Sequence, residues 1–148
     1  MTERQLLTDF SKKIKELKPT GTIVYEAKMV KTKSFRLASV AEHQVAGLLG
    51  ALHGLWYKIS DSPIYAGNKS RFTFKKPFDA CWIKAEEAYV VPIFYLPRKK
   101  KTAYLIPVKE FVRIVEDSRG KEKIPGIPAK STKSIKEVDL GKFVSLEL

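Results

Sequence analysis

The chain has 148 residues, 44% hydrophobic and 11% aromatic, which is long enough for one domain with a buried core and excludes a wholly disordered protein. Lys and Arg number 28 against 16 Asp and Glu, and the resulting formal net charge of +12 favours a polyanionic partner such as nucleic acid. A single cysteine excludes an internal disulfide, and no apolar run is long enough to cross a bilayer, so we expect a soluble cytoplasmic protein without membrane association.

The first two expected elements are a helix and a strand. Apolar residues three and four positions apart predict an amphipathic helix over residues 3–17, which the sequence KPTG ends. The run TIVYEAKMV at 22–30 predicts a strand, whose alternation puts Glu26 and Lys28 on one face between two valines. The pair is either an ordinary charge pair on a solvated face or a metal-binding carboxylate beside a lysine that steadies a nucleophilic water.

A second helix is expected from Ser39 to about His53. Ser39 and Glu42 have the spacing of a capping box, and Gly54 is placed to stop the helix. The sequence LWYKISD then predicts a short strand from residue 55.

The second half of the chain predicts more strands. They are expected at 77–83, at 89–97, where Pro92 indicates a bulge or an edge, and at 102–108, followed by a short helix or strand at 109–117. The sum is an α/β protein with a central mixed β-sheet flanked by helices.

The expected domain covers residues 1–120. Residues 121–148 are predicted to form a basic C-terminal tail, which docks partly on the domain through residues 143–146.

Asp79 is the second candidate for chemistry. Alternation places it with Cys81 on the face opposite Phe78 and Trp82, so we expect a part-buried carboxylate that needs a cation, a donor or a metal. The alternative is a structural aspartate bonded to backbone amides after Pro77.

Polar and basic residues near these elements are candidates for contact with DNA. His43 and Gln44 fall in the first turn of the second helix, which faces either a phosphate or plain solvent. Two basic turns either line one groove or are ordinary solvated loops. The candidate DNA-binding residues are Lys31, Lys33, Arg36, His43, Lys75, Lys76, Arg98 and Lys99.

The run GTIVYEAKMVKTKSFRLASVAEHQ, residues 21–44, resembles the core of RecU-type Holliday junction resolvases in the PD-(D/E)XK nuclease superfamily. In that family an EAK strand is followed by a basic turn, an SF-x-L step and a helix that opens with HQ. The same elements occur here in the same order. Residues 88–111 are similar to the closing strands of the family, so the resemblance covers about two thirds of the chain.

The resemblance implies a restriction-endonuclease-like fold and a Mg²⁺-dependent endonuclease, with Mn²⁺ as a possible substitute, that cleaves branched DNA in recombination and repair. It implies metal binding by an aspartate and Glu26, with Lys28 activating water and Gln44 positioning that water or the strand. It also implies a homodimer, for which Trp56, Trp82 or Phe94 could supply the interface.

The chain departs from the family in the place of its metal-binding aspartate. Relatives have it upstream of E-x-K, where this chain has its first helix, whereas residues 55–83 resemble that upstream segment. We therefore expect a rearranged order that brings Asp79 to a strand beside Glu26, with Asp61 as a weaker candidate in a turn. Without either aspartate the chain is a non-catalytic DNA-binding protein, and an RNA-associated basic protein is a third alternative.

Overall fold

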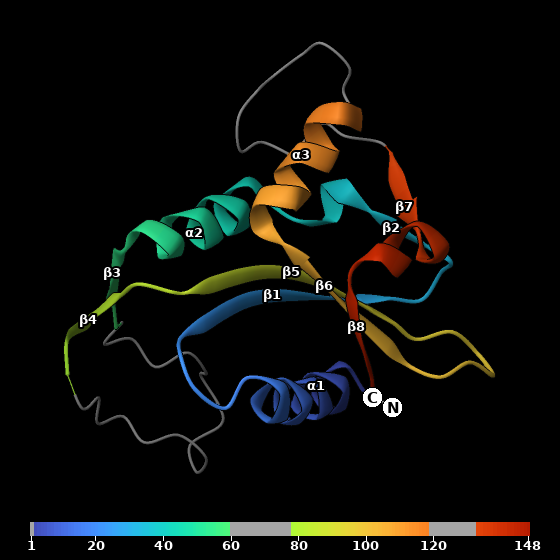
Figure 1. Cartoon of the computed structure of the whole chain (residues 1–148), viewed down its shortest axis with the longest axis horizontal. Coiled ribbons are helices and arrows are strands. Elements are labelled where there is room, and N and C mark those ends of the chain that lie inside the picture. Colours follow the sequence, from blue (N-terminus) through green and yellow to red (C-terminus); the bar gives the residue numbers. More distant parts are fainter. Residues whose placement is uncertain (1, 60–77, 119–132) are drawn as a thin grey trace, which may run out of the picture.

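The computed structural model describes residues 2–59, 78–118 and 133–148 (Figure 1). Two candidate regions therefore lie outside the described residues: Asp61, and the pair Lys75 and Lys76. The elements are α1 (Glu3–Leu17), β1 (Ile23–Val30), β2 (Ser34–Arg36), η1 (Leu37–Ser39), α2 (Glu42–His53), β3 (Leu55–Lys58), β4 (Ala80–Ile83), β5 (Glu87–Phe94), β6 (Thr102–Pro107), α3 (Val108–Ser118), β7 (Ser134–Lys136), η2 (Glu137–Lys142) and β8 (Val144–Glu147).

A four-stranded mixed sheet in the order β1-β5-β6-β8 forms the centre of the molecule. β1 and β5 are parallel, and the other two pairs are antiparallel. Helix α1 covers one face of the sheet, while α2 and α3 cover the other (Figure 1). This arrangement confirms the expected α/β class with a central mixed sheet flanked by helices. None of the helices in the described ranges is long and apolar enough to span a membrane.

Two apolar layers hold the helices on the sheet. On one face, the stripe Leu6, Phe10 and Ile14 of α1 is buried, as its spacing predicts, and the Phe10 ring meets Tyr25 of β1 edge-on at 4.9 Å. The segment after β6, for which the sequence allows a helix or a strand, is the helix α3. It packs on the other face of the sheet and buries residues such as Phe111. The sheet is therefore covered on both faces, as a parallel pair requires.

Helix α2 begins later than the sequence predicts, and the expected capping box of Ser39 and Glu42 is wrong. Ser39 ends the short helix η1, and its hydroxyl donates to the carbonyl of Arg36 at 2.6 Å. The side chain of Gln44 instead accepts from the backbone N–H of Ala41 at 3.0 Å. The Ser39 hydroxyl is thus bonded to the carbonyl of Arg36 and does not cap the start of α2.

The stop at Gly54 is confirmed. The φ angle of Gly54 is +102°, which is in the left-handed region, and its N–H donates to the carbonyl of Gly50 at 2.9 Å. A Cβ at this position would overlap the indole ring of Trp82, which packs across the glycine.

Gly54→Ala should therefore lower the free energy of unfolding by more than about 1 kcal/mol, because both the backbone and the neighbouring ring must shift. Gly47→Ala is the matched control: Gly47 lies at an exposed position of α2, a Cβ there has nothing within 4 Å, and the change should stabilise the protein by about 0.5–1 kcal/mol. Urea denaturation measures both. Equal effects of the two changes would contradict the close packing of Trp82 on Gly54.

Pro92 is neither at an edge nor at a bulge. It lies inside β5, the strand between β1 and β6, and its partner on β1 is Lys28. The pairing of β5 with β6 runs through Val90 and resumes at Ile93 in the same register. Proline lacks an N–H, so the ladder skips this position without inserting a residue. Phe94 on the same strand is only 1% exposed, so its expected role in an interface is wrong.

The described part of the C-terminal segment is built into the fold. β8 pairs with β6, at the residues around 143–146 where the tail is expected to dock. β7 also pairs with β2, and Leu140 between these strands is fully buried in the core shared by α2 and α3. Residues 133–148 thus complete two sheets and one apolar layer.

Candidate functional site

The face of β1 that carries Glu26 and Lys28 lies under α2. Alternate residues such as Tyr25 point to the α1 side, while Val24 and Val30 pack into the core on the α2 side. The two charged side chains share the face of the valines, between the sheet and the start of the helix. They are half-buried, with 30% of the Glu26 side chain and 26% of the Lys28 side chain exposed.

Glu26, Lys28 and Gln44 form one hydrogen-bonded cluster. The ammonium of Lys28 lies 3.1 Å from Oε1 of Glu26, and the amide Nε2 of Gln44 donates to the same oxygen at 2.7 Å. Because Gln44 Oε1 accepts from the N–H of Ala41, one side chain both caps α2 and orients the carboxylate. The structure therefore brings together three of the four catalytic candidates.

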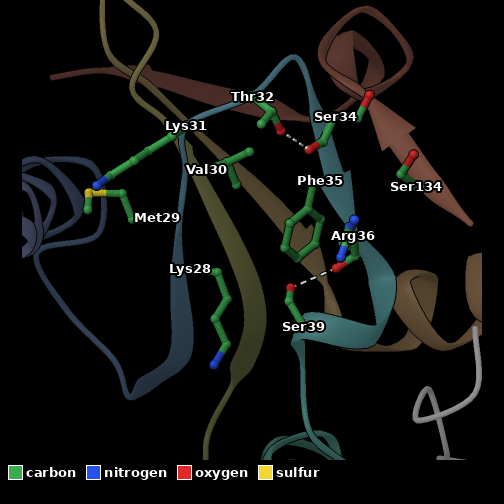
Figure 2. A pocket seen from close by; sticks show the side chains of 10 residues that line it. All are labelled: Lys28, Met29, Val30, Lys31, Thr32, Ser34, Phe35, Arg36, Ser39 and Ser134. Carbon is green, nitrogen blue, oxygen red and sulfur yellow. Dashed lines mark hydrogen bonds between the residues drawn. The ribbon is translucent and has the colours of Figure 1, made fainter. Parts of the chain in front are cut away.

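A cavity of about 430 Å³ opens beside this cluster, between β1 and β2. Figure 2 shows Lys28, Arg36 and Ser39 on the same side of β1 as the ring of Phe35, whereas Lys31 runs to the other side, toward Met29. Within the described residues no carboxylate lines the cavity, so its wall is positively charged. Polar side chains that line the cavity include those of Lys28, Thr32, Ser34, Arg36, Ser39 and Ser134.

Four hydroxyl-bearing side chains in this wall were not among the candidate residues. Thr32 and Ser39 donate their protons to the carbonyls of Ser34 and Arg36, at 2.7 and 2.6 Å, so their oxygens retain lone pairs. Ser134 reaches the cavity because β7 pairs with β2 and places it opposite Arg36. No local sequence signal places residue 134 beside residue 36, since that contact depends on long-range strand pairing.

Asp79 is not where the rearranged order requires it. The strand beside β1 is β5, while Asp79 immediately precedes β4, which pairs with β3 in a separate two-stranded sheet. Its side chain is exposed rather than part-buried, and its carbonyl accepts from the N–H of Ile59 at 2.9 Å. Both expectations are thus wrong, because the chain leaves α2 at Gly54 and enters a hairpin beyond the end of the central sheet (Figure 1).

The remaining DNA-binding candidates in the described residues lie on α2 and in two turns of the chain. His43 is exposed on α2, next to Gln44, and Lys33 is exposed in the turn between β1 and β2. Arg98 and Lys99 lie in the β5–β6 turn. The N–H of Tyr95 donates to the carbonyl of residue 30 at 2.8 Å, so this turn starts at the same end of the sheet as the β1–β2 turn.

The residues present meet the lower limit of a magnesium site. Mg²⁺ is usually held by one or two carboxylates together with waters and substrate phosphates. Glu26 supplies one carboxylate, and the basic cavity beside it suits a phosphate that would supply further oxygens. Among the described residues, no group of three or more His, Cys, Asp or Glu side chains is placed to hold a metal ion.

The basic wall of the cavity leads to a prediction about how the affinity for DNA depends on salt concentration. If a DNA phosphate occupies this cavity, as the basic sequence leads us to expect, Arg36→Gln should weaken binding to DNA of any sequence and reduce the slope of log affinity against log salt by about 1, since one phosphate contact would be lost. Lys13→Gln is the control, because Lys13 is exposed on α1, across the sheet from the cavity. Fluorescence anisotropy of labelled duplex at several salt concentrations measures the slopes. Equal slopes for Arg36→Gln and wild type would place the phosphate elsewhere.

Comparison with known proteins found no match among protein-family models, curated proteins or solved structures. The functional assignment therefore depends on two features of this chain: the Glu26–Lys28–Gln44 cluster and the basic cavity beside it.

Proposed function

We propose that this protein is a metal-dependent endonuclease that binds the DNA backbone in the basic cavity and cuts it beside Glu26. The observation that carries the proposal is the convergence of Glu26, Lys28 and Gln44 at the edge of that cavity. Lys28 contacts Glu26 and also lines the cavity, so a phosphate held in the cavity would lie next to the Glu26 carboxylate. These are also the residues that the resemblance to RecU-type resolvases singles out.

Backbone contact fits the groups in the wall. A guanidinium, an ammonium and several hydroxyls can all donate to or surround phosphate oxygens. None of these contacts reads a base edge, so we expect binding that depends on DNA shape rather than on sequence. The net charge of +12 adds a long-range attraction for the same ligand.

Each member of the cluster has a proposed role. Glu26 would hold Mg²⁺, or Mn²⁺, together with phosphate oxygens of the substrate, and the metal would supply charge stabilisation and a more acidic water. Lys28 would place a positive charge beside the scissile phosphate. Gln44 keeps the Glu26 carboxylate oriented through its hydrogen bond and is itself fixed by Ala41.

Branched DNA is the proposed substrate, and a homodimer the proposed active form. A four-way junction has two-fold symmetry, and its resolution needs two nicks, which two identical subunits related by a two-fold axis can supply. The support for this finer specificity is the resemblance carried by residues 21–44 and 88–111, together with the basic wall of the cavity. A role in DNA recombination and repair inside the cell follows from that substrate.

A non-catalytic DNA-binding protein is the second candidate. It is favoured by the position of Asp79, which precedes β4 in the separate two-stranded sheet and so does not supply the aspartate that the rearranged order requires beside Glu26. This candidate keeps the basic cavity and its phosphate contacts but predicts no cleavage.

The two candidates are separated by incubating the protein with a labelled four-way junction and with a linear duplex, in Mg²⁺, Mn²⁺ or EDTA. The nuclease should nick the junction in either metal, spare it in EDTA and cut the duplex more slowly. Binding of the junction without nicking in any condition would instead establish the second candidate.

A further inference from the structure

The hairpin of β3 and β4 exposes large aromatic side chains. The exposed fractions are 70% for Trp56, 57% for Tyr57, 52% for Phe78 and 54% for Trp82. Aromatic rings of this size are usually buried, and their concentration on β3, β4 and the residue that shortly precedes β4 indicates a surface that binds a ligand. None of these residues takes part in the cluster around Glu26 or in the cavity beside it.

The two tryptophans lie side by side on one face of this two-stranded sheet, and we call the pair the tryptophan platform. Trp56 and Trp82 are directly paired across the hairpin, and their ring centroids are 5.5 Å apart in an edge-to-face arrangement. The next pair on the same face is Lys58 and Ala80. No acidic residue occurs within β3 or β4, so this face combines two indoles with one ammonium.

The backbone of Gly54 packs against the ring of Trp82 and holds it in place. Trp82 packs so closely on Gly54 that a Cβ there would overlap its ring. The glycine's φ of +102° lets the chain turn directly from α2 into β3, beneath the ring. Contact with rigid backbone orients the indole before any ligand arrives, which lowers the entropy lost on binding.

We propose that this face binds unpaired bases of nucleic acid by stacking them on Trp56 and Trp82, with Lys58 contacting the adjacent phosphate. Indole faces stack with any base, and a lysine beside them suits the backbone. A protein interface would bury aliphatic side chains as well, but Leu55 and Ile83 lie on the other face of the hairpin and are half-buried already. The inference shares with the proposed function only the class of ligand and uses none of its residues.

The chain's own fluorescence tests this proposal directly, because its two tryptophans are the two residues of the platform. A single-stranded oligothymidylate should quench the emission, since stacking on an indole removes its excited state efficiently, whereas a blunt duplex of equal length should quench much less. Trp56→Ala should weaken binding of the labelled single strand about tenfold or more, and Trp56→Phe should recover most of it.

Val138→Ala is the matched control, because Val138 is 81% exposed in η2, outside the hairpin, and its change should leave affinity within about twofold. Glu26→Gln should bind and quench as wild type does, even if no variant nicks DNA, which separates this inference from the proposed nuclease. Single-strand binding without quenching, and unaffected by Trp56→Ala, would overturn it. So would loss of self-association in Trp56→Ala with unchanged DNA affinity, which would assign the face to a second copy of the chain.

Discussion

Glu26→Gln should reduce nicking of a four-way junction at least about a hundredfold while leaving the affinity for the junction within about twofold. The substitution keeps the shape of the side chain but removes the charge that a metal ion needs. Lys28 and the cavity wall remain, so the phosphate contacts survive. Nicking rates in Mg²⁺ and junction affinity in EDTA measure the two effects separately.

Gln44→Ala and Asp79→Asn sharpen this result. Gln44→Ala leaves the carboxylate in place but removes the donor that orients it, so nicking should fall less than in Glu26→Gln and the start of α2 should lose about 1 kcal/mol of stability. Normal nicking by Asp79→Asn would show that Glu26 acts without that aspartate. Loss of nicking there would show that the hairpin meets the site when DNA is bound. Undiminished nicking by Glu26→Gln would reject the proposed site.

Leu140→Ala should lower the free energy of unfolding by about 2–5 kcal/mol, which is the usual range for a leucine deleted from a well-packed core. The Leu140 side chain is fully buried beside residues of α2 and α3, although it lies in a segment whose sequence predicts a partly docked tail. Urea denaturation monitored by circular dichroism measures the change.

Val138→Ala in the same short helix is the comparison, since Val138 is 81% exposed and its truncation should change stability by less than about 0.5 kcal/mol. Similar small effects at both positions would mean that residues 133–148 are dispensable for the core. A large difference would establish that this segment is part of the folding unit.

Several features of the fold could be predicted because they depend on neighbours in the sequence. The three- and four-residue spacing of Leu6, Phe10 and Ile14 predicts α1 and its buried face. Strand alternation predicts that Glu26 and Lys28 share a face, and the structure shows their side chains in contact. The need for a left-handed residue after α2 identifies Gly54.

The features that could not be predicted depend on which strands pair. Alternation predicts which residues of a strand share a face, but it does not predict which strands are neighbours. Pro92 therefore lies in a central strand although proline is typical of an edge. Asp79 likewise lies next to a strand of a different sheet from the one that contains Glu26. The contact of Gln44 with Glu26 needed helix α2 to pack on β1.

The sequence by itself determined a basic α/β protein with an amphipathic first helix and a Glu–Lys pair on one strand face, because periodicity and charge are local properties. Only the tertiary structure decided that Gln44 completes that pair, that Ser134 joins the cavity wall, and that Trp56 and Trp82 form one exposed platform. The physical reason is that each of these contacts joins residues far apart in the chain, and burial of the whole core selects among the many pairings that local patterns allow.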